Sequence, residues 1–137
     1  MSLLSWDSSF SVGVETIDKQ HKKLFELINT LHDAMMCGKD HAILESVLAS
    51  LLDYTKYHFL FEEGLMDKSD YPYSVQHKME HKNIRAKLFE LQAEYSEGNP
   101  GANMHVMEFL KVWLIDHIIM GNEDMKLGRY VSSSSQP

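Results

Sequence analysis

The chain has 137 residues, of which 44% are hydrophobic and 24% are charged, with a formal net charge of −7. This length and composition are typical of one soluble domain with its own core, and the acidic balance argues against nucleic acid and anionic membranes as partners. The single cysteine, Cys37, cannot form an internal disulfide. The sequence shows no signal-peptide pattern, and no stretch approaches the roughly 18 apolar residues that a membrane-spanning helix needs. We therefore expect a cytoplasmic protein.

Four segments repeat apolar residues at steps of three and four, which predicts four amphipathic helices. Gly38 is suited to end the first of them, and Pro72 is suited to the first turn of the third. The approximate bounds of the predicted helices are 16–37, 43–65, 72–95 and 102–120.

The segments outside these helices are short. Residues 1–14 are predicted to form an irregular arm, whose Trp6 and Phe10 pack onto the domain, and a short helical piece follows the fourth helix. We expect one domain over residues 1–131 and a disordered serine-rich tail over 132–137. Four helices with short connections favour an all-α fold, an up-down-up-down antiparallel four-helix bundle with an irregular N-terminal arm and a short C-terminal helical segment.

Six potential metal ligands stand at positions that such a bundle brings to one level. The first and third helices carry theirs near their starts, and the second and fourth carry theirs near their ends. These helix ends meet at the same end of an antiparallel bundle, and the two pairs spaced four apart each share a helix face. The residues are His21, His58, Glu62, His77, His81 and His117.

Taken singly, each of these residues is ordinary, because a histidine four residues from a glutamate or another histidine is often a coincidence. Six such groups at one level of an apolar core are costly to bury unless they coordinate something. We therefore predict a bound metal. The other histidines, His32, His41 and His105, fall at other levels of the bundle, and we assign them to the surface or to polar packing.

Several stretches along residues 5–130 carry a more specific signal, and their combination resembles the hemerythrin family in its single-domain bacterial form, bacteriohemerythrin. Myohemerythrin, a member of that family, is a standard example of the bundle predicted above. The stretches are Trp6, Val12–Val14, Ile17–His21, Tyr57–Phe59, Glu62–Glu63, Tyr71–Pro72, Trp113–Leu114 and His117–Ile118.

The resemblance implies a non-haem site with two iron ions joined by an oxo or hydroxo bridge. His77, His81 and His117 would bind one iron, and His21 and His58 would bind the other. The resemblance also implies that Glu62 bridges the two irons through its two carboxylate oxygens.

One position departs from the family pattern. A second bridging carboxylate is expected five residues after the last histidine, where this chain has Asn122. A neutral amide leaves about one more positive charge at the site, so we expect weak or partial loading of the two-histidine iron. Two alternatives stay open. A π-bulge near Gly121 would bring in Glu123, and a helix that ends early after Gly121 would let Asp124 reach the site.

The ligand set also bears on function. Carboxylate-rich di-iron bundles support substrate oxidation, whereas five neutral imidazoles favour ferrous iron and reversible chemistry. The resemblance implies reversible dioxygen binding, for transport, storage or delivery, and we expect no enzymatic activity. The apolar wall of the oxygen pocket is expected to comprise Ile28, Phe59, Trp113, Leu114 and Ile118.

Other functions remain open. The chain is alternatively a sensor of oxygen, redox state or nitric oxide, an iron-handling or peroxide-consuming protein, or a bundle that holds another metal such as zinc. The expected partners are dioxygen and an unidentified oxygen-accepting protein, with neither nucleic acid nor a membrane among them. We expect a monomer or a weak homo-oligomer.

Overall fold

The structure is a computed structural model that describes residues 4–38, 41–98, 101–114 and 123–134. Within these ranges all regular structure is helical, which confirms the predicted fold class. None of the described helices is long and apolar enough to cross a membrane. The elements are η1 (Ser8–Phe10), α1 (Glu15–Met36), α2 (His41–Ser69), α3 (Ser74–Ser96), α4 (Ala102–Leu114) and α5 (Glu123–Ser134).

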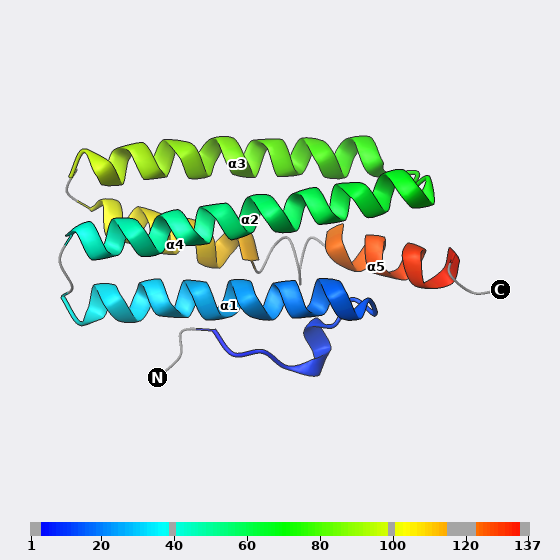
Figure 1. Ribbon diagram of the computed structural model, residues 1–137, viewed down its shortest axis with the longest axis horizontal. Coiled ribbons are helices and arrows are strands. Elements are labelled where there is room, and N and C mark those ends of the chain that lie inside the picture. Colours follow the sequence, from blue (N-terminus) through cyan, green and yellow to red (C-terminus); the bar gives the residue numbers. More distant parts are fainter. Residues whose placement is uncertain (1–3, 39–40, 99–100, 115–122, 135–137) are drawn as a thin grey trace.

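Four of the helices form an antiparallel bundle (Figure 1). α1 packs against α2 and α4, and α3 packs against the same two helices, so the four enclose one common core. α5 lies beyond the end of α4 (Figure 1) and packs against α2. The predicted up-down-up-down bundle with a short C-terminal helical segment is therefore confirmed.

The helix bounds differ from the prediction in places. α3 begins at Ser74, after Pro72. The backbone of Asp70 has a positive φ of 52°, and the Tyr71 N–H donates back to the Met66 carbonyl at 3.0 Å. This closure ends α2, and the chain then makes a turn through Pro72 before a new helix starts. The last part of the predicted fourth helix, 115–120, lies outside the described residues. α5 continues to Ser134 and so includes the start of the serine-rich tail, while 135–137 also lie outside the described residues.

The buried apolar side chains form two clusters. The larger one fills the bundle and takes residues from α1, α2, α3 and α4, among them Leu24, Ile28, Phe59 and Leu110. The smaller cluster joins the N-terminal arm, α1, α2 and α5, and it consists of Val12, Ile17, Met66, Tyr71 and Leu127. Between the two clusters, α1 and α2 also carry buried polar residues, and these belong to the site described below.

The N-terminal arm packs along α1, as expected. The rings of Trp6 and Phe10 lie 5.5 and 5.7 Å from the ring of Phe25. The side chain of Asn29 makes two hydrogen bonds with the backbone of Leu4, both 2.8 Å long. These contacts fix the arm beside the helix that follows it in the chain.

The arm also holds α5 in place. Leu127 is fully buried, and Gly128 lies so close to Val12 that a Cβ atom at this position would overlap the Val12 carbonyl oxygen. The Tyr130 hydroxyl donates to the Ser69 carbonyl at 2.9 Å. The position of α5 thus depends on a close backbone approach that only glycine permits.

We predict that Gly128→Ala lowers the free energy of unfolding by about 1–3 kcal/mol, because the added methyl group overpacks the contact with Val12. Since α5 must shift to accommodate the methyl group, the variant should also hold less metal than the wild type. Denaturant unfolding and elemental analysis measure the two effects.

Gly64→Ala is the matched control, because a Cβ atom at Gly64 would meet nothing within 4 Å. Alanine favours a helix more than glycine does, so this control should gain about 0.5–1 kcal/mol. Equal stability changes in the two variants would contradict the proposed close contact of α5 with the arm.

Candidate metal site

Six buried polar side chains meet between the two apolar clusters. α1 contributes one of them, α2 two, α3 two and α5 one, and every one is 0% exposed. On α1 and α2, buried apolar residues stand on both sides of these positions: Ile17 and Leu24 on α1, and Leu51 and Met66 on α2. The side chains are His21, His58, Glu62, His77, His81 and Asp124.

These side chains form two groups that share both carboxylates. In each group the potential ligand atoms all lie within 4.8 Å of one another. One group consists of His21, His58, Glu62 and Asp124, and the other of Glu62, His77, His81 and Asp124. The arrangement therefore offers two adjacent positions for a cation, with Glu62 and Asp124 at both.

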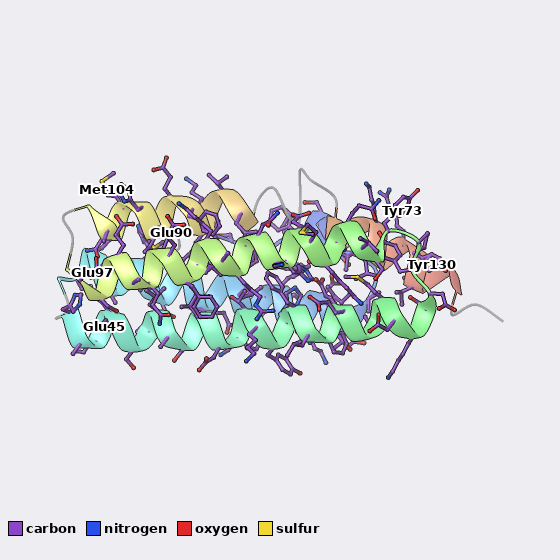
Figure 2. The ribbon with its side chains drawn as sticks, turned by 90° about the horizontal axis from the view of Figure 1, so that it is seen from above. Glu45, Tyr73, Glu90, Glu97, Met104 and Tyr130 are labelled. Carbon is purple, nitrogen blue, oxygen red and sulfur yellow. The ribbon has the colours of Figure 1, made fainter. Side chains whose placement is uncertain are left out.

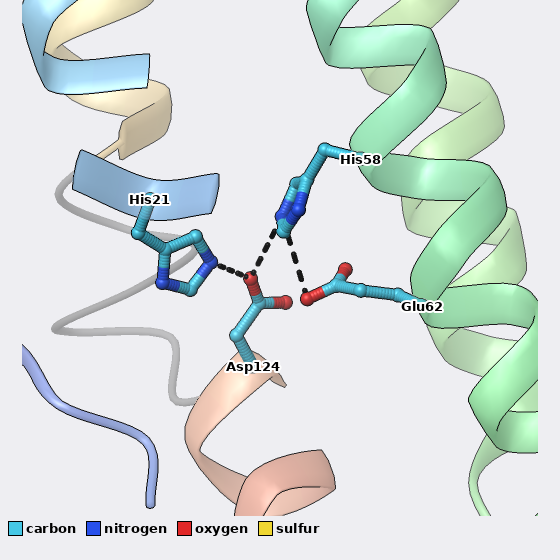
Figure 3. A group of neighbouring side chains, drawn as sticks. All are labelled: His21, His58, Glu62 and Asp124. Carbon is cyan, nitrogen blue, oxygen red and sulfur yellow. Dashed lines mark hydrogen bonds and ion pairs between the residues drawn. The ribbon is translucent and has the colours of Figure 1, made fainter. Parts of the chain in front are cut away.

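Asp124 divides its two oxygens between the groups. Its Oδ2 lies 2.6 Å from His21 Nε2 and 3.5 Å from His58 Nε2, as Figure 3 shows. Its Oδ1 lies 3.1 Å from His77 Nε2, in the other group. A carboxylate placed in this way can bridge two cations.

Glu62 has the same arrangement from the opposite side. Its Oε2 lies 3.4 Å from His58 Nε2 (Figure 3), while its Oε1 lies 3.0 Å from His81 Nε2 and 3.5 Å from His77 Nε2. Both carboxylates thus direct one oxygen to each group. The two carboxylates are therefore arranged almost symmetrically about the two ligand groups, which a site for a single ion would not require.

Two neighbouring side chains set the orientation of the imidazoles. Gln20 Oε1 lies 2.6 Å from His58 Nδ1, and Glu63 Oε2 lies 2.9 Å from His81 Nδ1. Because an amide oxygen and a carboxylate oxygen both accept, each Nδ1 is the protonated donor and Nε2 directs its lone pair into the cluster. Such contacts raise the basicity of metal-binding histidines and fix their rings.

The two carboxylates of the cluster shift the pKa of His77. Burial by itself lowers the pKa of His77, but the hydrogen bonds and charges of Asp124 and Glu62 outweigh it and raise the pKa to about 9. In the metal-free chain His77 is therefore protonated at neutral pH. A proton on His77 then offsets part of the negative charge of the two buried carboxylates.

The donor atoms suit a pair of first-row transition metal ions. Imidazole nitrogens bind iron, zinc and copper, and carboxylates that bridge two ions are typical of di-iron bundles. The imidazoles contribute Nε2 atoms aimed at the carboxylates, and the whole set is buried, as a metal cluster of fixed geometry requires. The residues present therefore fit the metal that the sequence predicts.

The structure brings together five of the residues that the sequence singled out: His21, His58, Glu62, His77 and His81. His117 and Asn122 lie outside the described residues. Of the two alternatives to Asn122, Asp124 lies in the cluster, on the first turn of α5. Glu123 begins the same helix, and its side chain is outside the described set.

The sequence did not reveal the orienting role of Gln20 and Glu63, although both stand next to predicted ligands. Gln20 precedes His21, and Glu63 follows Glu62. A buried amide beside a histidine, at 3% exposure, is the signal that points to Gln20, and it becomes visible only once the helix face is known.

The apolar residues expected near the site are buried where the structure describes them. Phe59 stacks on His81 with ring centroids 3.9 Å apart and meets Trp113 edge to face at 5.8 Å. Ile28 is fully buried in the larger cluster. The side chain of Leu114 and all of Ile118 lie outside the described set.

The three histidines assigned to the surface or to polar packing lie away from the cluster. His41 and His105 are exposed, and each pairs with a glutamate: His41 Nε2 lies 2.8 Å from Glu45 Oε1, and His105 Nδ1 lies 2.9 Å from Glu94 Oε1. His32 is partly buried.

Comparison with known proteins supports the predicted resemblance. The profile of one family, described as the hemerythrin HHE cation binding domain, matches residues 12–127. The chain is 37% identical over 118 residues to a bacteriohemerythrin of Pseudomonas paraeruginosa, and the matched region covers 86% of this chain and 76% of that protein. It is 35% identical over 114 residues to myohemerythrin-1 of Phascolopsis gouldii, and this matched region covers 82% of this chain and 83% of that protein. A crystal structure of wild-type hemerythrin superimposes with a TM-score of 0.86 at 30% identity, over 96% of this chain and 99% of the other.

We predict that Gln20→Leu weakens metal binding by about 10- to 100-fold, because His58 loses the acceptor that orients its ring. Leucine has a similar size, so the helix and its packing should persist. Metal titration of the metal-free chain, followed by the protein's absorption, measures the affinity.

Gln20→Glu is the matched control, since it keeps an oxygen acceptor at the same position. Its affinity should stay close to that of the wild type. If Gln20→Leu bound metal as tightly as the wild type, the orienting role of Gln20 would be wrong.

Proposed function

We propose, since the chain belongs to the hemerythrin HHE cation-binding family, that its buried cluster holds two iron ions and binds dioxygen reversibly. The observation that carries the proposal is the pair of ligand groups that share Glu62 and Asp124. With such a site, the protein would carry, store or deliver dioxygen.

The residues divide between the two irons by their grouping. His21 and His58 would bind one iron, and His77 and His81, with His117 from the segment outside the described residues, would bind the other. Glu62 and Asp124 would bridge the two, since each directs one oxygen to each group.

Asp124 changes the charge balance that Asn122 alone would leave. Two ferrous ions carry four positive charges, and one bridging carboxylate offsets only one of them in a poorly polarisable interior. With Asp124 beside Glu62 the cluster supplies two negative charges, at positions that both irons share. We infer that both irons load fully, in place of the partial loading expected from Asn122.

A pair of ferrous ions held by these residues would supply the two electrons needed for reversible dioxygen binding. The chain's own residues have other tasks. Phe59 and Trp113 wall the site with apolar rings and keep out water, which slows loss of the ferrous state. Gln20 and Glu63 hold His58 and His81 in the tautomer that binds metal through Nε2.

We also propose that the protein is a binding protein and not an enzyme. Neutral imidazoles outnumber carboxylates in the cluster, and such a set favours ferrous iron over the highly oxidised iron that substrate oxidation needs. Sustained consumption of hydrogen peroxide by the purified, iron-loaded chain would contradict this and favour peroxide removal.

The function is tested on protein purified from iron-rich growth. We expect two irons per chain by elemental analysis, and a visible absorption band that appears on exposure to dioxygen and disappears when dioxygen is removed. Fewer than two irons, or a spectrum that does not respond to dioxygen, would overturn the proposal.

Asp124→Asn tests which residue completes the site. We predict that the iron content falls from two per chain toward one, because a neutral amide cannot bridge the two ions, and that the oxygen-dependent band is lost with it. Elemental analysis and the visible spectrum report both effects.

Asn122→Asp is the matched variant for this experiment. If Asp124 is the bridging residue, adding a carboxylate at Asn122 should leave the iron content at the wild-type value. An increase in iron on Asn122→Asp, together with no change on Asp124→Asn, would assign the role to position 122 instead.

A further inference from the structure

A second collection of metal-binding side chains lies at the other end of the bundle. A groove of about 560 Å³ runs between the end of α1 and the start of α4. Figure 2 shows Met104 at the end of the molecule opposite Tyr73 and Tyr130. The potential donors that line the groove are His32, Met35, Met36, Met104 and Met107.

The thioethers belong to two helix faces that look into the same groove. Met104 and Met107 are three residues apart on α4, and His32 is four residues from Met36 on α1, so each pair shares one face of its helix. Met36 is 74% exposed and Met104 is 73% exposed. An incoming ion therefore reaches these sulfur atoms without any rearrangement of the core.

His32 adds a nitrogen donor to the same groove. Its Nδ1 is buried and makes no hydrogen bond with the part of the chain that the structure describes. The Asp33 Oδ1 lies 3.7 Å away, beyond hydrogen-bonding distance. The ring therefore has only this long ion-pair contact at Nδ1 among the described residues, and an imidazole nitrogen can bind a metal ion.

We propose that this groove binds one Cu(I) ion through the thioethers and His32. Thioether sulfur is a soft, neutral ligand that selects Cu(I), and imidazole binds copper as well, whereas hard ions prefer oxygen donors. The two charged residues of the groove, Glu108 and Lys111, have opposite signs, so the lining has no net charge. A monovalent soft ion suits such a lining better than a divalent ion does. This site is independent of the function proposed for the buried cluster.

The proposal is tested by titrating the full-length, ferrous-loaded chain with Cu(I) in the absence of dioxygen, against a coloured Cu(I) chelator. All variants carry Cys37→Ser, because the exposed thiol that follows Met36 would otherwise bind Cu(I) itself. We expect one Cu(I) per chain with no release of iron. The methyl signals of the groove methionines in NMR spectra should shift on binding.

Met36→Leu combined with Met104→Leu should weaken Cu(I) binding by more than about ten-fold, since two soft donors are lost. Leucine keeps the volume and the apolar character of the groove, so the fold is preserved. Met79→Leu is the matched control, because Met79 is 52% exposed on α3, outside the groove, and this variant should bind like the wild type.

Three results would overturn the proposal. The first is wild-type affinity in the double variant. The second is a set of groove methyl signals that stays unchanged while Cu(I) binds. The third is release of iron in step with Cu(I) uptake, which would place the copper in the buried cluster.

Discussion

The burial of two carboxylates among imidazoles is the constraint on which the rest of the structure depends. An ionised carboxylate transferred alone into an apolar interior is strongly unfavourable, and a charge pair offsets that cost only with good geometry and further hydrogen bonds. Glu62 and Asp124 meet this requirement through histidines from three different helices. The raised pKa of His77 is in line with this demand, because the two carboxylates favour its protonated form although burial disfavours it. A bound cation pair satisfies the same demand with more charge, which is why metal and fold should be coupled at this end of the bundle.

The apolar core and the polar cluster contribute separately to this arrangement. Among the side chains that the structure describes, the larger apolar cluster joins α1, α2, α3 and α4 and includes none from α5. The bundle can therefore form its main core independently of the segment that supplies Asp124. α5 instead depends on Leu127 and on the close approach of Gly128 to Val12. The N-terminal arm thus has two tasks, since it covers α1 and also positions the helix that completes the site.

Much of the fold and most of the site follow from the sequence, because helix periodicity and bundle topology are strong constraints. His58 with Glu62 and His77 with His81 share helix faces by spacing alone, and antiparallel packing brings both pairs to one level. The position of Asp124 in the cluster did not follow from the sequence. Each further residue along a helix rotates the side-chain direction by about 100°. Which carboxylate reaches the cluster therefore depends on where one helix ends and the next begins, and residue spacing carries no information on these boundaries. Gln20 was missed for a related reason, since its contact with His58 depends on two side-chain rotamers. α3 starts later than predicted because the chain first closes α2 at Asp70 and Tyr71, whereas the prediction placed Pro72 in the first helical turn.

The two ends of the bundle place different demands on an ion. At the buried end the donors are nitrogen and charged oxygen, and the ion must give up all its water, which only strong charge compensation makes favourable. At the groove the donors include neutral sulfur from exposed methionines, so a weakly hydrated, soft ion can bind with little desolvation and no charge partner. His21 and His32 illustrate the contrast within one helix. They lie about 16 Å apart along its axis at 1.5 Å per residue, and the first is surrounded by buried charge while the second faces thioethers. Because the thioethers of the groove favour a soft monovalent ion and the buried carboxylates favour ions of higher charge, ligand chemistry and burial would let one small helical domain keep two metals apart.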